Sequence, residues 1–165
     1  MAIDLIEVQV PGQQGPPGPA APFYGQAGRM TAGTISVASQ DVYQETGLAA
    51  VFDSTIASGV ALATTNTFGL RNVSGLTKIF RVYGSFDAKA NNNEILGIRL
   101  AKNGLSIAET ECRAFSGSSQ QEAKLVTSWM ILLANNDEVS LFIANHSGTH
   151  PITFGRGRIL MSAVN

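Results

Sequence analysis

Residues Lys78–Asp87, KIFRVYGSFD, are the stretch of sequence that decides the fold. Side chains of an extended chain alternate between two faces, so Phe80, Val82 and Phe86 share one face. The opposite face carries Ile79, Arg81, Tyr83 and Ser85. Aromatic and β-branched residues in strict alternation are typical of a β-strand with one buried face. This stretch therefore predicts a strand of a sheet that covers a core.

Similar runs continue on both sides, separated by Gly, Ser, Asn and Asp. The predicted strands are Thr34–Ser39, Leu48–Asp53, Gly59–Ala63, Thr67–Val73, Glu94–Ala101, Leu105–Thr110, Ala123–Ala134, Glu138–Asn145 and Arg158–Val164. Asn103-Gly104 lies between two of these runs, and Asn-Gly is the strongest short signal for a β-hairpin turn. No window keeps a helical period over three turns. The sequence predicts an all-β protein of roughly eight to ten strands, a β-sandwich or jelly roll.

Composition excludes several classes of protein. Charged residues make up 14% of the 165 residues, against roughly 25% in an average soluble domain. The net charge of −1 gives no electrostatic reason to expect a nucleic acid or a membrane as partner. No apolar run reaches the roughly 18 residues of a spanning helix, and no signal-peptide pattern is present. The single cysteine, Cys112, excludes an intrachain disulfide and a multi-cysteine metal site.

A glycine repeat lies ahead of the predicted strands. Residues Gly12–Ala20 read GQQ-GPP-GPA, three consecutive Gly-X-Y triplets. Their characteristic residues are Gly12, Gly15, Pro16, Pro17, Gly18 and Pro19. A collagen triple helix needs glycine at every third position, but a stiff polyproline linker with accidental spacing fits the same residues. We assign residues 12–33 to a collagen-like stalk and linker, and residues 34–165 to a β jelly-roll head.

The first residues, 1–11, are predicted to be an anchoring arm. Ile6, Val8 and Val10 share one face of an extended chain, and Pro11 ends the run. An isolated strand is not stable in water, so this one has to pair with another sheet. The predicted partner-binding residues are Ile3, Leu5, Ile6, Val8 and Val10. The alternative is that the arm folds back on its own head, with recognition in distal loops such as Asn91–Asn93 or Ser116–Gln121.

The stretch Lys78–Val164 resembles the globular heads of C1q-like and tumour-necrosis-factor-like jelly rolls. The matching pieces are Phe80–Phe86, Ile98–Gly104, Trp129–Leu133, Asn136–Leu141 and the last predicted strand, Arg158–Val164. Asn136-Asp137 stands where the family usually has Gly-Asp or Gly-Glu, and Asn also tolerates the left-handed conformation. The resemblance implies a homotrimer around an apolar axis. Several members of the family carry collagen-like stalks on the N-terminal side, and this sequence has its Gly-X-Y triplets on that side too.

Residues Trp129–Leu133 are apolar on both faces of their predicted strand. Such a strand is expected between a core and a neighbouring subunit. The predicted residues of the core and the trimer contact are Phe80, Val82, Phe86, Trp129, Ile131 and Leu133.

Residues that could carry chemistry are few. His146 and His150 are interpreted as loop histidines, although one histidine from each chain could bind a metal on a threefold axis. Asp137, His146 and a serine could be combined into a catalytic triad on paper. The sequence has no nucleophile elbow G-x-S-x-G to support such a triad. Cys112 lies among Glu109, Glu111 and Arg113, which do not obviously favour a thiolate. Gly155–Arg158 is interpreted as a small basic loop. We predict no catalytic residue, no metal and no cofactor, hence no enzyme.

Two function classes remain. The first is a virion structural protein: a homotrimeric capsid decoration or head-fibre protein of a tailed bacteriophage, made in the bacterial cytoplasm. Its arm would bind the major capsid protein or another virion protein. The second is a receptor-binding tail-fibre tip or a spore-surface C1q-like adhesive head. Ten arm residues and three triplets span a few nanometres at most, which favours a short anchor on a nearby surface.

Overall fold

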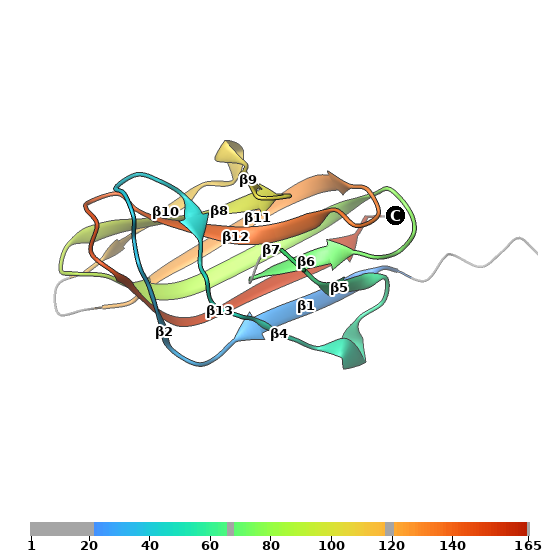
Figure 1. Cartoon of the computed structure of the whole chain (residues 1–165), viewed down its shortest axis with the longest axis horizontal. Coiled ribbons are helices and arrows are strands. Elements are labelled where there is room, and N and C mark those ends of the chain that lie inside the picture. The colour runs from blue at the N-terminus through green and yellow to red at the C-terminus, as the bar shows by residue number, and fades with distance from the viewer. Residues whose placement is uncertain (1–21, 66–67, 118–120, 165) are drawn as a thin grey trace, which may run out of the picture.

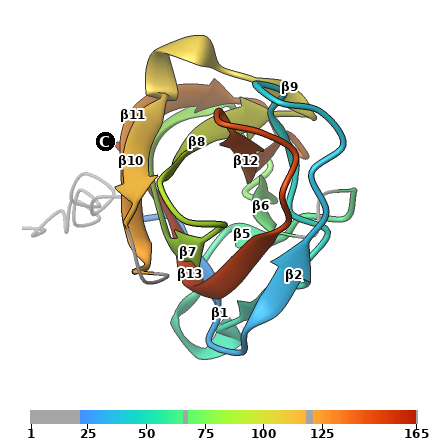
Figure 2. The same ribbon diagram turned by 90° about the vertical axis from the view of Figure 1, so that its left-hand side faces the viewer.

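The computed structural model describes residues 22–65, 68–117 and 121–164. Their secondary structure consists of thirteen β-strands and two short 3-10 helices, η1 (Ser54–Ile56) and η2 (Ala108–Thr110). The strands form two antiparallel sheets that curve around a common core (Figures 1 and 2). The predicted all-β jelly-roll sandwich is confirmed. Within the described ranges, no helix has the length and apolar character needed to cross a membrane.

The first sheet contains the longest strands. Its order is β11 (Ala123–Leu133), β7 (Lys78–Lys89), β13 (Ile152–Ala163), β1 (Tyr24–Arg29) and β4 (Val51–Phe52), and β2 (Gly33–Ile35) also pairs with β13. The second sheet has the order β10 (Cys112–Ser116), β8 (Glu94–Lys102), β12 (Glu138–Asn145), β6 (Gly69–Asn72) and β5 (Val60–Leu62). Two short strands, β3 (Gln44–Glu45) and β9 (Leu105–Ser106), pair with β12 and β8.

The core lies between the two sheets and follows the alternation of β7. Phe80, Val82 and Phe86 are fully buried there, while Ile79 and Tyr83 point away from the core. The ring of Phe86 meets those of Phe68 and Phe154 edge to face, at centroid distances of 4.9 and 5.1 Å. Gly84 of β7 faces the buried side chain of Leu141, which fills the space where a Cβ would stand. A glycine is therefore required at this point for the sheets to approach.

Several elements differ from the sequence prediction. β1, β3 and β10 were not predicted, and β13 begins at Ile152 instead of Arg158. The run Leu105–Thr110 is a strand only over its first two residues, because η2 follows. The hairpin turn at Asn103-Gly104 is confirmed, since both residues have the positive φ that such a turn requires, 50° and 80°.

The predicted start of the head at Thr34 is wrong. Tyr24–Arg29 pairs with β13 over its whole length, from Tyr24 opposite Ser162 to Arg29 opposite Gly157. This segment reads YGQAGR, so it lacks the apolar alternation that marked the other strands. Its backbone pairing with β13 holds it in the sheet, and Ala27 adds one small side chain to the core.

The two ends of the head's chain lie close together. Because β1 is antiparallel to β13, the first described residues meet the last ones, and the Ala163 amide donates to the Phe23 carbonyl at 2.7 Å. Figure 1 shows β1 starting at the end of the molecule where the C-terminus is marked. Whatever precedes residue 22 is therefore attached at this end.

Candidate functional site: an apolar sheet face

The outward side of the first sheet carries many large apolar side chains. We call this surface the apolar face and define it by its exposed large residues, Tyr24, Ile79, Tyr83, Val126, Met130 and Leu132. They come from β1, β7 and β11. Met130 and Leu132 are the most exposed of them, each at 58%.

The strand register brings some residues of the apolar face together across neighbouring strands. Leu132 lies directly opposite Ile79 on the neighbouring strand, and Met130 lies opposite Arg81. Tyr83 lies opposite Ser128 on one side and opposite Leu160 of β13 on the other. Directly opposite side chains on one face of a sheet are within contact distance of each other. Leu132 and Ile79 therefore adjoin directly, as do Tyr83 and Leu160, and Arg81 and Ser128 lie among these residues on the same side of the sheet.

Such a face is unusual for a sheet that meets water. An antiparallel sheet with one solvated side normally alternates apolar residues inside with polar residues outside. Here β11 has apolar residues on both sides: Leu125, Ile131 and Leu133 are buried in the core, while Met130 and Leu132 are exposed. Contiguous exposed apolar patches mark interaction surfaces in soluble proteins. The apolar face therefore has the character of a surface that another molecule covers.

Charged residues take over at one end of the same sheet face. Lys124 lies opposite Asp87 on the neighbouring strand. The Asp87 carboxylate forms an ion pair with Arg156 and accepts a hydrogen bond from it. Gly155–Arg158 is part of β13, with a register irregularity between Phe154 and Arg156, and not a loop as predicted. The two arginines project toward solvent, and Arg156 pairs with Asp87 while Arg158 donates to Gln26.

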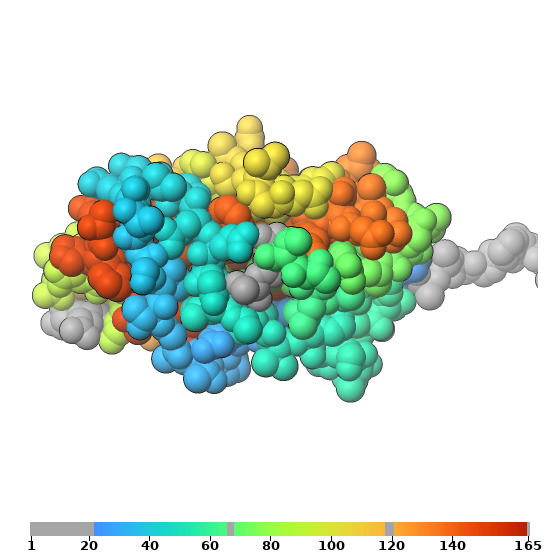
Figure 3. Space-filling view, viewed as in Figure 1, coloured from blue at the N-terminus to red at the C-terminus, as the bar shows by residue number. Residues whose placement is uncertain are grey.

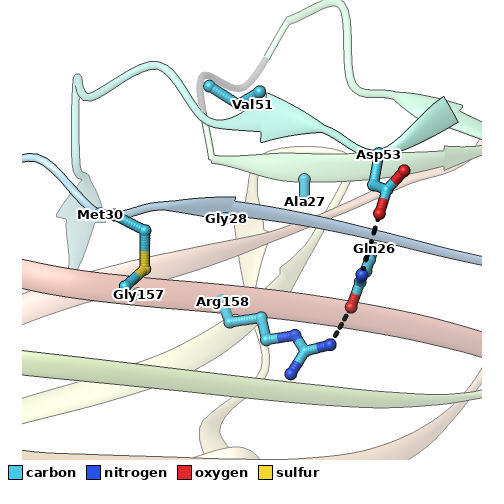
Figure 4. Close-up of a pocket in the computed structure, with 8 residues that line it drawn as sticks. All are labelled: Gln26, Ala27, Gly28, Met30, Val51, Asp53, Gly157 and Arg158. Carbon is cyan, nitrogen blue, oxygen red and sulfur yellow. Dashed lines mark hydrogen bonds between the residues drawn. The ribbon is translucent and has the colours of Figure 1, made fainter. Parts of the chain in front are cut away.

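A pocket of about 320 Å³ opens beside these arginines, over β1, β4 and β13. Figure 4 shows Met30 and Val51 at its rim, with Gly28 and Gly157 leaving room between them. Gln26 accepts a hydrogen bond from Arg158 and donates one to Asp53 at 3.4 Å. Met30 and Val51 are exposed at 78% and 76%, so the rim is apolar and accessible.

Trp129 occupies an edge rather than the core. Its neighbours of the same parity, Thr127 and Ile131, are buried, but Trp129 is 45% exposed. Among the described strands, β11 is the last of its sheet and pairs only with β7. The second sheet does not enclose the indole at this border. Trp129 therefore lies on the rim of the sandwich, on the other side of β11 from Met130 and Leu132.

The structure places the predicted core and trimer-contact residues in two different settings. Phe80, Val82, Phe86, Ile131 and Leu133 are all buried within the subunit's own core. Only Trp129 is accessible. The residues available to a partner are those of the apolar face. The sequence signal for them is an apolar side chain at a position where strand alternation predicts a polar, solvent-facing one. The predicted arm residues, Ile3, Leu5, Ile6, Val8 and Val10, and the predicted stalk, Gly12–Pro19, lie outside the described residues.

The residues considered for chemistry are not brought together. Asp137 precedes β12 and binds Lys102 at 2.9 Å, whereas His146 follows the other end of β12 and binds Asp41 at 2.6 Å. His150 contacts Glu94 instead, at 2.5 Å. Burial would raise the pKa of Asp137, but hydrogen bonds from Asn103 and Lys102 and the Ala134 amide lower it, so this carboxylate is a structural acceptor. Within the described ranges, no three His, Cys, Asp or Glu side chains are grouped as metal ligands would be.

Two Asn-X-Ser sequences, at Asn72 and Asn145, are also structural. Both asparagines are fully buried. The Asn72 amide donates to the carbonyls of Leu76, Leu133 and Ala134 at 2.8 to 3.1 Å. The Asn145 amide donates to Glu94 at 2.7 Å. Neither side chain is available for modification in this fold.

No protein-family model and no curated protein matches the sequence. Solved structures do match. The Eiger TNF of S. frugiperda is similar at a TM-score of 0.61 and 10% identity, over 87% of this chain and 93% of that one. The PRD1 vertex protein P5 is similar at a TM-score of 0.56 and 12% identity, over 87% of this chain and 97% of that one. At these identities the likeness shows the fold alone: the sandwich is a TNF-like jelly roll.

Proposed function

We propose that this protein is a non-enzymatic structural protein of a virus particle: a homotrimeric capsid decoration or head-fibre protein of a tailed bacteriophage. The apolar face is the observation that carries the self-association. Three subunits that cover this face around an axis would bury Ile79, Met130 and Leu132, which are exposed in the single chain. The Gly-X-Y triplets support the number three, because a collagen-like segment requires three chains.

The position of the chain ends supports a head-and-anchor arrangement. Residues 1–21 join the head at the end where β1 begins, so three arms of a parallel trimer would leave together. Fully extended, they reach at most about 75 Å. We propose that the arm adds its apolar row Ile6, Val8 and Val10 to a sheet of the major capsid protein or another virion protein. Three arms would bind with avidity, so a weak single contact would suffice.

The comparison with a vertex protein adds support at the level of the fold. PRD1 vertex protein P5 has the same kind of sandwich, and its name places it at a vertex. We take from this only that a TNF-like head is compatible with a place on a particle surface. The competing function is a receptor-binding or adhesive head whose distal loops recognise a ligand.

The test is decoration of particles that lack this protein. The variant Ile6→Asp/Val8→Asp places two charges in the apolar row, and Gln9→Asp/Gln13→Asp adds the same charge outside it. We expect the control to bind as the wild type does and the arm variant to lose at least about 100-fold in affinity, with both still trimeric. Wild-type affinity of a trimeric arm variant would overturn the anchoring role and favour recognition by the head.

A further inference from the structure

A strap of residues 36–43 joins the two sheets at the open edge of the sandwich. It follows β2, which pairs with β13 of the first sheet, and leads into β3, which pairs with β12 of the second. Figure 3 shows this segment, in light blue, on the surface beside the orange-red loop that follows β12. Both pairings are short, since β3 has two residues and β2 has three. The strap therefore depends on contacts made by its own side chains and amides.

Those contacts converge on the residues after β12. The Asp41 amide donates to the Asn145 carbonyl at 3.0 Å, and the Gln40 side chain donates to the His146 carbonyl at 2.8 Å. Asp41 has a φ of 63°, a conformation that costs a non-glycine residue energy and that the surrounding contacts have to maintain. Val37 packs against the core, and these polar interactions hold the part of the strap around Asp41.

His146 is the centre of this contact. Its side chain is only 5% exposed. Nδ1 lies 2.6 Å from the Asp41 carboxylate, and Nε2 lies 3.1 Å from the Tyr43 hydroxyl and 3.5 Å from the Glu111 carboxylate. Both ring nitrogens thus face oxygen atoms of residues that belong to other elements.

The hydroxyl proton of Tyr43 is used in a hydrogen bond to Glu111. Its hydroxyl donates to Glu111 at 2.6 Å, the shorter of its two contacts. Burial would raise the pKa of Glu111, but hydrogen bonds from Tyr43, Arg113 and Arg99 lower it to about 2, so this group is an ionised acceptor. Burial and the neighbouring Glu111 raise the pKa of Tyr43 far above its usual value, so the phenol keeps its proton. The Tyr43 oxygen is left to accept from His146.

With the phenol proton directed at Glu111, each ring nitrogen of His146 faces an acceptor, a carboxylate at one and the phenol oxygen at the other. A neutral imidazole has a single N–H, whereas the imidazolium has two. The carboxylates of Asp41 and Glu111 face the ring and favour a cation, whereas Arg99 and Arg113, which pair with Glu111, offset part of that attraction. The geometry therefore fits the protonated ring.

We propose that protonated His146 latches the strap, so that the strap is a pH-sensitive element of the head. Loss of the proton removes one donor: Tyr43 then has to turn its hydroxyl from Glu111 to Nε2, or Nε2 is left facing an oxygen lone pair. The charge attraction to Asp41 is lost in the same step. The latch is complete while both ring nitrogens carry protons and loosens when one of the two protons is lost.

Two measurements on the 15N-labelled full-length protein between pH 5.5 and 8.5 test this. Two-bond 1H–15N spectra report the protons on each nitrogen of His146, and hydrogen exchange reports the protection of the Asp41 amide after correction for the intrinsic rate. We expect two ring protons at pH 5.5, and a fall of at least about tenfold in protection by pH 8.5. His146→Gln removes this pH dependence, and the control His150→Gln keeps it.

Three results would overturn the proposal. One is a singly protonated His146 at pH 5.5. Another is Asp41 protection that stays constant from pH 5.5 to 8.5 in the wild type, whatever the state of the ring. The third is an unchanged pH dependence in His146→Gln, which would assign the response to another group.

Discussion

Single buried polar residues in this head replace the hydrogen bonds that strands cannot supply. Asn72 shows this most clearly, because its amide donates to three carbonyls and its oxygen accepts from the Ser74 amide and hydroxyl. These contacts tie the end of β6 to the turn after β11. A buried polar group that loses its partner costs about 1–3 kcal/mol, and removal of Asn72 leaves several groups without one.

We therefore expect Asn72→Ala to lower the free energy of unfolding by about 3 kcal/mol in denaturant titrations. Asn91→Ala, at an exposed loop position, serves as the control and should stay within about 0.5 kcal/mol of the wild type. Equal stability of the two variants would mean that the Asn72 contacts contribute nothing net.

Glu111 gives the head part of its acid sensitivity. Its pKa in the folded protein is about 2, below the ordinary 4.5, so the stabilisation is present above pH 4.5 and is lost as the pH falls toward 2. We expect Glu111→Gln to flatten the stability profile between pH 5 and pH 2 by about 2 kcal/mol. Glu109→Gln leaves the Tyr43, Arg99 and Arg113 contacts in place and should keep the wild-type slope. A variant slope identical to that of the wild type would contradict this role.

At the scale of elements, alternate residues of β11 have different roles: one set packs in the core and the other set forms part of the apolar face. Leu133 points into the core and is fully buried, and its neighbour Leu132 points outward and is 58% exposed. Loss of a buried leucine side chain leaves a cavity, whereas an outward substitution leaves the packing of the core unchanged.

Leu133→Ala should therefore cost about 2–5 kcal/mol of stability. Met130→Asp/Leu132→Asp should keep the circular dichroism spectrum of the wild type but sediment as a single chain, because the charges lie in the proposed subunit contact. A trimeric aspartate variant would remove the apolar face from the interface.

Sequence alternation predicted which side chains of β7 and β11 are buried, because those strands are long and cover the core with one face. It did not predict the exposure of Trp129, since parity says nothing about whether a strand lies at the border of its sheet. It also missed β1, whose Gly25 and Gly28 leave no apolar row. Backbone pairing with β13 forms that strand, and pairing partners distant in sequence leave no local signal.

At the scale of the whole molecule, the head and the residues before it have separate roles in the account. The described head alone carries the apolar face, and three Gly-X-Y triplets add little to such a contact. Deletion of residues 1–21 is expected to leave the oligomeric state unchanged in light scattering while abolishing attachment to particles. Dissociation of the shortened protein would show that the first 21 residues, and not the apolar face, hold the subunits together.

The fold was accessible from the sequence to a greater degree than the candidate site. Patterning and turn residues such as Asn103-Gly104 predicted a sandwich, because they act locally. The position of the apolar face depends on which of the two apolar sides of β11 is covered by the second sheet. The strap contact forms only because Asp41, Glu111 and His146, from three distant parts of the sequence, lie next to one another in the fold. Contacts of this kind are determined by the tertiary fold and leave no local pattern in the sequence.

The mass of the wild-type protein in solution tests the central claim most directly. Sedimentation equilibrium over micromolar concentrations should give three times the chain mass of 17.4 kDa, about 52 kDa, because we propose that the apolar face is the contact of a trimer. A mass of 17.4 kDa throughout this range would contradict the account, since the exposed Ile79, Met130 and Leu132 would then face water in the native state.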